Sequence, residues 1–291
     1  MTKVLEQAAD QPTKDAAPIS RQSAPAPLTP NPWLAAWSIA SREWLRFVRQ
    51  RNRMIGAIGQ PLIFWIFLSA GFHGSFTAAG TTNVKYLEFF FPGTAMLIVL
   101  FTAIFTTISV IEDRREGFMQ SVLVAPIPRF ALVSGKLAGG TALAMMQALI
   151  FLSLGFIGGI QFPWLGIVAS FAFLILCAIS LTGMGFILAW RMESVQGFHA
   201  IMSIFLIPMW LLSGAVFPAD KSWLAWIMTA NPMTYLMAGF RRLLYLGSEE
   251  RIPTGTPGLA LSLTVSLVFC GLMFWGSCHI ARARVRGDVR S

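Results

Sequence analysis

The stretch "IEDRREGFMQSVLVAPIPR", from Ile111 to Arg129, places a run of charged residues, Glu112 through Glu116, between two long apolar segments. Charged residues make up only 12% of this chain of 291 residues, whereas hydrophobic residues make up 55%. A soluble domain of this size needs more charge to cover its surface, so the composition indicates an integral membrane protein. The stretch is therefore predicted to be a charged connection between two membrane-spanning helices.

The apolar segments predict an all-α membrane protein with six spans. A helix needs about 20 apolar residues to cross the hydrocarbon of a bilayer. Six segments approach or exceed that length: 56–73, 88–111, 138–158, 164–190, 198–217 and 258–279. The first is marginal in length, and Gln60-Pro61 is expected to bend it or break its first turn. Two glycine pairs with four-residue spacing, Gly135 with Gly139 and Gly155 with Gly159, predict close helix packing.

The sequences before the first predicted span and after the last differ from the spans in composition. Residues 1–32 are rich in Ala, Pro, Ser, Thr and Gln, which predicts a disordered cytoplasmic tail. Residues 33–280 form the predicted transmembrane domain, and 281–291 form a basic cytoplasmic tail.

An amphipathic helix is predicted over 33–53, directly before the first span. At 100° per residue, an aromatic face carries Trp33, Trp37, Ala40, Trp44 and Phe47. The opposite face carries the arginines Arg42, Arg46, Arg49 and Arg53. Such a helix suits the interface of a membrane, and its position before a span favours this over an ordinary soluble surface helix.

Basic residues predict the orientation. An even number of spans puts both termini on one side. Lys and Arg are concentrated in 1–53, 112–136 and 282–290, while the other side carries Lys85, Lys221, Arg241, Arg242 and Arg251. The positive-inside rule then places both termini in the cytoplasm. The net charge of +9 is accordingly a topology signal, and we expect no nucleic-acid partner.

The segment 221–247 is apolar enough to suggest a seventh span. Asn231-Pro232 interrupts it and is typical of a helix start, with Asn at the cap and Pro at the first position. Gly247 is a plausible end of that helix. A seventh span would also place the C-terminal arginines outside. We therefore predict two short helices at the outer leaflet.

The search for an active site finds little. The three cysteines and three histidines lack metal-ligand spacing, and Gly135-Lys136 lacks the other residues of a nucleotide-binding loop. We expect no catalytic, cofactor-binding or metal-binding residue. Charges in the predicted spans occur only at their ends, which argues against a proton-driven carrier. The energy for transport must then come from elsewhere, or the protein is a passive pore.

Uncharged polar residues are the remaining candidates for a translocation path. Thr102, Thr106 and Ser109 share a face of the second predicted span, and Ser203 and Ser213 lie in the fifth. Hydroxyl groups in membrane helices often bond to their own helix or to a neighbour. The alternative is a mildly polar path for an amphipathic substrate.

The stretch 111–129 contains more acidic residues than the positive-inside rule requires of a cytoplasmic loop. Phe118, Met119, Val122 and Leu123 form an apolar stripe at helical spacing that ends at Pro126. Mixed charge beside a short apolar stripe favours a docking surface. A solvated loop whose charges merely cancel is the alternative.

The sequence resembles the permeases of ABC-2 type exporters, a family that includes daunorubicin-type drug-resistance permeases, nodulation-factor exporters and polysaccharide exporters. The family's motif after the second span is matched by Glu112, Asp113, Arg114, Arg115, Glu116, Gly117, Leu123, Pro126, Arg129 and Gly135-Lys136. "LLSGAVFPAD" (211–220) and "NPMTYLMAGFRRLLYLG" (231–247) match two further motifs. The resemblance covers about 33–280. Phe118 and Gln120 depart from the family, which often has Thr and an acid there.

The resemblance implies a six-span permease that pairs with a second permease, identical or different, and with two ATPase subunits that bind ATP-Mg. The loop 112–129 is then the coupling helix, 33–53 the interface helix, and 221–247, with Asn231, Pro232 and Arg241, the outer gate region. An ATP-driven exporter of an amphipathic or lipid-linked substrate in the bacterial cytoplasmic membrane is expected. The alternatives are an ATP-independent channel or carrier and a membrane-embedded lipid-modifying enzyme.

Overall fold

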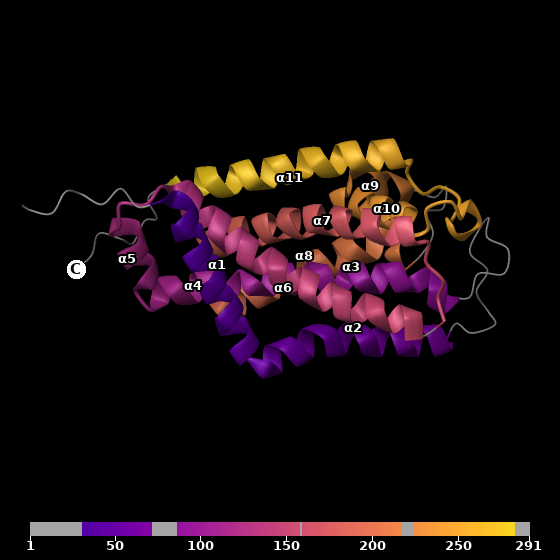
Figure 1. Cartoon of the computed structure of the whole chain (residues 1–291), viewed down its shortest axis with the longest axis horizontal. Helices are drawn as coiled ribbons and strands as arrows, with labels where there is room; N and C mark the ends of the chain where they lie inside the picture. The colour runs from indigo at the N-terminus through magenta and orange to yellow at the C-terminus, as the bar shows by residue number, and fades with distance from the viewer. Residues whose placement is uncertain (1–30, 72–85, 158, 217–223, 283–291) are drawn as a thin grey trace, which may run out of the picture. The chain divides into compact units, whose positions relative to one another are not determined.

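A computed structural model describes residues 31–71, 86–157, 159–216 and 224–282 (Figure 1), and within these ranges it has helices and no strand, which confirms the all-α prediction. The helices are α1 (Pro32–Arg49), α2 (Arg51–Gly71), α3 (Tyr86–Thr106), α4 (Ile108–Arg115), α5 (Phe118–Val124), α6 (Arg129–Ile157), α7 (Trp164–Arg191), α8 (Val195–Trp210), η1 (Leu211–Ala215), α9 (Leu224–Ala230), α10 (Pro232–Leu244), η2 (Glu249–Arg251) and α11 (Leu259–Arg282).

The two predicted tails lie almost wholly outside the described residues. Asn31 and Pro32 fall in the predicted N-terminal tail, but Pro32 is the first residue of α1 and Asn31 caps it, with its side chain accepting a hydrogen bond from the Trp33 amide. Ala281 and Arg282 are the last residues of α11 rather than part of a tail.

Five described helical segments are long and apolar enough to cross a membrane. They are Tyr86–Arg115, Arg129–Ile157, Trp164–Arg191, Val195–Ala215 and Leu259–Arg282. They correspond to the second through sixth predicted spans. The apolar part of α2, Ile58–Gly71, is shorter, so the first span stays a prediction. A break at Gln60-Pro61 is wrong, because α2 continues as one helix with Pro61 inside it, whereas the other expected outcome, a bend, stays a prediction.

Helix α3 forms the centre of the described bundle. It packs against α2, α6, α7 and α10, and nearly all its side chains are buried. A helix that is apolar on all sides requires such neighbours. At one end, which we call the α5 end, α1 crosses α6 near α4 and α5, while α9 and α10 lie at the opposite end, the α10 end (Figure 1).

Glycine allows α1 to approach α6 closely. A Cβ atom on Gly135 would lie 2.6 Å from the backbone oxygen of Ala36, and one on Gly139 would lie 2.8 Å from the Cβ of Glu43. The first predicted packing pair is therefore confirmed, with α1 as its partner. The second pair fails at Gly159, which follows the end of α6 in a turn with a φ of 76°, because an added Cβ there would meet no described atom within 4 Å.

The two short helices predicted within 221–247 are confirmed as α9 and α10. The Asn231 side chain accepts a hydrogen bond from the Met233 amide at 3.0 Å, and Pro232 is the first residue of α10. The helix ends at Leu244, before the expected end at Gly247, which lies in a turn with a φ of 82°. The placement of these helices at the outer leaflet stays a prediction.

The packing of α1 on α6 can be tested at Gly135. Gly135→Ala is expected to lower stability by about 1–3 kcal/mol, because the new methyl group meets backbone that cannot rotate away. Gly271→Ala is the matched control, since a Cβ there meets nothing within 4 Å in the middle of α11. Thermal unfolding of the detergent-purified chain measures both. Equal effects of the two substitutions would contradict the close approach.

Candidate functional site

A buried carboxylate organises the α5 end. The side chain of Asp113 on α4 has no exposed surface. Arg42 of α1 donates to both of its oxygens, at 2.7 and 3.0 Å, and Arg46 donates to Oδ1 at 2.8 Å. The hydrogen bond to Asp113 raises the pKa of Arg42. Buried carboxylates are tolerated when they are paired in this bidentate way.

A buried lysine joins this carboxylate to a second one. Lys136 of α6 and Glu43 of α1 have side chains only 3% and 5% exposed, and the Lys136 Nζ donates to Glu43 at 2.6 Å. The same ammonium donates to Asp113 and to the Ser109 hydroxyl, the latter at 3.1 Å. We call Arg42, Glu43, Arg46, Asp113 and Lys136 the charge cluster. It links α1, α4 and α6 at one point.

The other charges of the opening stretch also contact this chain. Arg46 lies 3.0 Å from Glu112 and 3.2 Å from Glu116. Arg114 donates to the carbonyl oxygen of Trp190, at the end of α7. Arg115 donates to that of Glu193 at 3.1 Å, so both arginines attach α4 to the end of α7. The predicted docking role of these charges is not tested by contacts within one chain.

The short helix predicted after the charges is confirmed as α5. Gly117 turns the chain between α4 and α5 with a φ of 78°, a left-handed conformation that favours glycine. The Arg42 guanidinium lies 3.7 Å from the centre of the Phe118 ring, and Met119 is buried. Val124 is 86% exposed. One side of α5 is thus attached to the bundle and the other is open.

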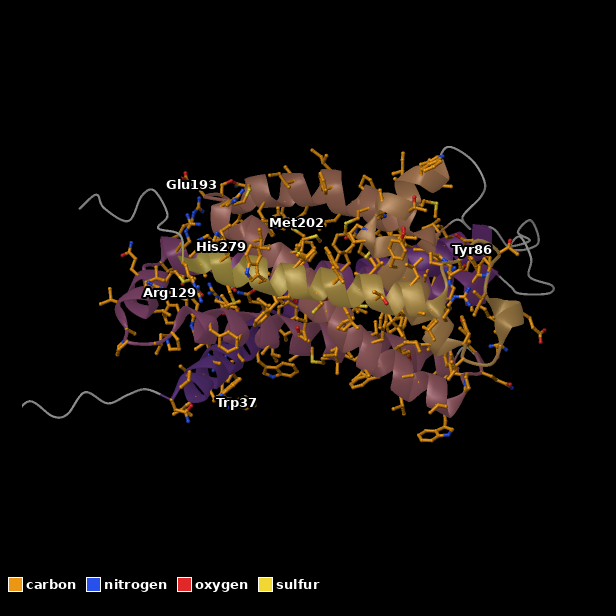
Figure 2. All side chains as sticks on the ribbon, turned by 90° about the horizontal axis from the view of Figure 1, so that it is seen from above. Trp37, Tyr86, Arg129, Glu193, Met202 and His279 are labelled. Carbon is orange, nitrogen blue, oxygen red and sulfur yellow. The ribbon has the colours of Figure 1, made fainter. Side chains whose placement is uncertain are left out.

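The remaining predicted residues of the loop lie around α5. Leu123 is half-buried against the core, Pro126 is exposed after the helix, and Arg129 is the first residue of α6. Figure 2 shows Arg129 and Glu193 toward one end of the bundle and Tyr86 toward the other.

The faces of α1 differ from the prediction. The buried side carries Ala36, Ile39, Glu43 and Phe47, whereas Trp37 is 72% exposed and projects away from the bundle in Figure 2. Arg42 and Arg46 turn toward Asp113, and Arg49 is exposed. The predicted helix over 33–53 is divided at Gln50, so that Arg53 belongs to α2. The exposed tryptophans fit membrane anchoring better than core packing.

Glu43 was not among the residues predicted from the sequence, and Lys136 was considered only as a loop charge and a motif residue. Glu43 lies four residues from both Ile39 and Phe47, on the same buried face. An acid on the apolar stripe of a helix is the signal that could have identified it.

The five hydroxyl residues considered for a path are bonded within the chain. Thr102 donates to Gln147 of α6, Thr106 donates to the carbonyl oxygen of Ala103, and Ser109 accepts from Lys136. Ser203 and Ser213 donate to carbonyl oxygens of their own helical turns, those of His199 and Trp210. Ser203 is exposed, and the other four are buried. These bonds fit the interpretation that the hydroxyls bond to their own helix or to a neighbouring helix. A role in a translocation path stays a prediction.

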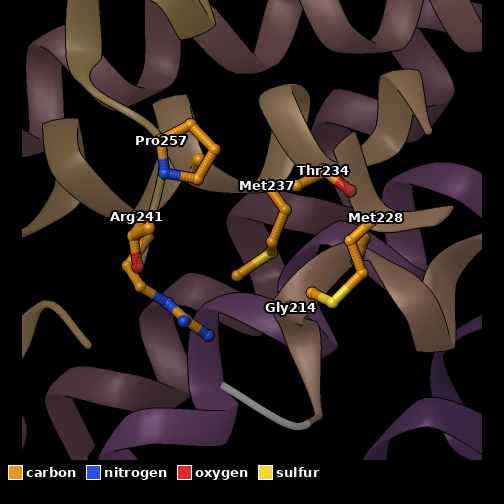
Figure 3. Close-up of a pocket in the computed structure, with 9 residues that line it drawn as sticks. Gly214, Met228, Thr234, Met237, Arg241 and Pro257 are labelled. Carbon is orange, nitrogen blue, oxygen red and sulfur yellow. The ribbon is translucent and has the colours of Figure 1, made fainter. Parts of the chain in front are cut away.

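The residues expected at an outer gate, Asn231, Pro232 and Arg241, all lie on or next to α10. Asn231 donates to the carbonyl oxygen of Met209 at 2.6 Å, which attaches α10 to α8. Arg241 is buried and donates to the carbonyl oxygen of Phe89 on α3 at 3.2 Å. Burial lowers the pKa of Arg241 to about 10, so the guanidinium stays protonated at neutral pH. Figure 3 shows Arg241 beside Met237 and Pro257.

Within the ranges that the structure covers, no group of three or more His, Cys, Asp or Glu side chains could hold a metal ion. The expectation that the chain binds no cofactor stays a prediction. The apolar helices and the charge cluster at one end define a multi-pass α-helical membrane protein.

Comparison with known proteins identifies the family of this chain. The sequence model of the family described as ABC-2 type transporter matches residues 35–245 of this chain. A Cyanophora paradoxa protein named as a transport permease, ycf38, is 28% identical over 79% of this chain and 83% of its own length. The daunorubicin resistance ABC transporter permease protein DrrB1 of Streptomyces coeruleorubidus is 26% identical over 70% and 72%. Nodulation protein J of Rhizobium leguminosarum is 25% identical over 65% and 71%.

The chain belongs to the ABC-2 type transporter family. It is a permease subunit of an ABC transporter, and membership of the family implies partnership with ABC ATPase subunits.

The charge cluster can be tested by a double-mutant cycle. Lys136→Met is expected to lower stability by about 3–5 kcal/mol, because it removes the closest cation from Glu43 and leaves that buried carboxylate only the longer contact with Arg42 at 3.5 Å. Adding Glu43→Met should recover part of that loss, since the apolar pair buries no charge. Thermal unfolding of the purified chain measures both variants. Arg49→Met, on the exposed side of α1, is the control, and strictly additive effects of the first two substitutions would contradict the pairing.

Proposed function

We propose that this chain is the membrane subunit of an ATP-driven exporter that moves an amphipathic or lipid-linked substrate out across the bacterial cytoplasmic membrane. ATP-Mg is bound and hydrolysed on two separate ATPase subunits. A second permease, identical or different, completes the translocation path. The drug-resistance name of the Streptomyces relative supports export of an amphipathic compound.

The observation that carries this proposal is the attachment of α5 to the charge cluster. Arg42 contacts Phe118 of α5 and Asp113 of α4 with one guanidinium. Asp113 is in turn bonded to Lys136 of α6. Separating such a buried pair costs about 3–5 kcal/mol, so a displacement of α5 moves α1, α4 and α6 with it. A subunit that pushes on the open side of α5 would therefore move the bundle.

The open side of α5 suits a protein partner. Gln120, Ser121 and Val124 are exposed on it, next to the exposed Arg115 and Glu116. An apolar side chain surrounded by polar and charged groups is the usual composition of a protein interface. Lipid would not favour this mixture, which supports docking of the ATPase here.

The surface of α8 supports an amphipathic substrate. Ile204 and Phe205 are largely exposed, and the exposed Ser203 hydroxyl lies beside them. A mainly apolar surface with an occasional hydroxyl suits a substrate that has both apolar and polar parts. Because the hydroxyls of α3 are buried in this chain, we place the path between two permease copies rather than through one.

Six spans and a cytoplasmic α5 end complete the proposal. Helix α2 has 21 residues and so a length of roughly 31 Å, close to the thickness of the hydrocarbon layer. Trp65 attaches it to the core by donating to the carbonyl oxygen of Leu87 at 3.2 Å. The arginines of α1 and α4 lie at the α5 end, which the positive-inside rule places in the cytoplasm.

Docking on α5 is tested at Val124. Val124→Asp should reduce capture of the ATPase by the purified permease at least tenfold, because a charge replaces an apolar contact at the interface. Stability of the permease alone should be unchanged, since Val124 is 86% exposed. Ile157→Asp, at an 82% exposed position at the other end of α6, is the control and should leave capture unchanged. Normal capture by the Val124 variant would contradict docking on α5.

Topology is tested with reporter fusions. A reporter joined after Arg290 and one inserted between Pro126 and Ile127 should both report the cytoplasm, whereas one inserted at Gly255 should report the periplasm. Six spans require these three results together. A periplasmic signal after Arg290 would mean that the number of spans is odd.

A further inference from the structure

Arg241 is a buried cation whose charge is not matched by a carboxylate in the described part of the chain. Its exposed fraction is 3%, and its Nη2 donates to the carbonyl oxygen of Phe89. The guanidinium carbon lies 4.5 Å from the centre of the Phe89 ring. Among the residues that the structure describes, the Nε–H has no hydrogen-bond partner. A buried charge in this condition is costly, because buried charges are normally both paired and hydrogen-bonded.

A small cavity adjoins this guanidinium. Its volume is about 20 Å³, which exceeds the roughly 10–15 Å³ that one water-sized particle needs. The residues labelled in Figure 3 come from η1, α9, α10 and the segment before α11: Gly214, Met228, Thr234, Met237, Arg241 and Pro257. The cavity is large enough for a water-sized particle such as a monatomic ion.

The hydrogen-bonding groups around the cavity favour an anion. The carbonyl oxygens of Thr256 and Pro257 already accept from Arg242, at 3.0 and 2.7 Å. The Thr234 hydroxyl makes only a long bond of 3.4 Å, to the carbonyl oxygen of Leu212, so it can turn to another acceptor. The lining thus offers a cationic N–H and a hydroxyl as donors.

The two methionines of the lining add a preference among anions. Met228 and Met237 present apolar, polarisable side chains to the cavity. Such surroundings cannot replace the full hydration shell of a strongly hydrated anion. A large, weakly hydrated monatomic anion loses the least hydration free energy when it enters the cavity.

We propose that Arg241 and Thr234 bind a halide ion, chloride under physiological conditions, in the cavity between α10 and η1. The ion supplies the negative charge that the buried guanidinium lacks and so stabilises the packing of α10 against η1 and α3. The site is independent of the transport direction and of the ATPase proposed above.

Halide binding is tested on the full chain purified in detergent, with tryptophan fluorescence as the measure of thermal unfolding. Chloride is titrated against gluconate at constant ionic strength, since gluconate carries the same charge on a much larger molecule. The melting temperature should rise by about 3 °C for each tenfold increase in chloride above the dissociation constant. Bromide should act in the same way, and its anomalous scattering in crystals should place it in contact with Arg241.

Three variants separate this site from a general salt effect. Arg241→Gln should abolish the chloride dependence and should be at least as stable in gluconate as the unmodified chain, because the unmatched charge is gone. Thr234→Val should need several-fold more chloride. Arg251→Gln, which removes an arginine elsewhere at the α10 end, should keep the full response.

Several results would overturn the proposal. They are an equal melting temperature of the unmodified chain in chloride and gluconate, a bromide position away from Arg241, and an equal loss of the response in Arg251→Gln. A carboxylate partner is the fourth: Asp220, which follows η1 in sequence and lies outside the described residues, is the acid to test. If Asp220→Asn destabilises the chain in gluconate and this effect disappears in the Arg241→Gln background, Asp220 is the counter-charge. If Arg241→Gln fails to fold, the bromide position and the Thr234 variant decide.

Discussion

The fold at the α5 end depends on the pairing of buried charge. Asp113 has no exposed surface, so it must be neutralised within the protein, and three cations converge on it. These cations come from α1 and α6, which fixes where both helices lie relative to α4. Gly135 and Gly139 make that position sterically possible, because any larger side chain would separate α1 from α6.

The same pairing gives the open helix α5 a firm connection to the bundle. Arg42 holds Asp113 with its nitrogens and covers the Phe118 ring with its plane. A guanidinium can do both at once, whereas the point charge of a lysine cannot form the two-pronged bond. The ring of Phe118 thus contributes a contact between α5 and α1.

Charge is confined to the two ends of the described bundle. Placing a charge at the centre of a membrane costs about 2.5–3.5 kcal/mol. The middle of α3 and α6 instead carries hydroxyl and amide groups that bond to each other or to the backbone, as Thr102 does with Gln147. Arg241, at the α10 end, is buried like Asp113 but lacks a described counter-charge, which makes it the natural place for an ion.

The sequence by itself determined the features that arise locally. It predicted the apolar segments, the Asn231-Pro232 start of α10 and the short helix after Gly117, because caps, proline and periodicity act within a few residues. The partners of the charges were decided by tertiary structure, since Glu43 and Lys136 are 93 residues apart. The buried face of α1 was also decided there. Lipid and protein interior are equally apolar, so periodicity marks an apolar face without showing which of the two covers it.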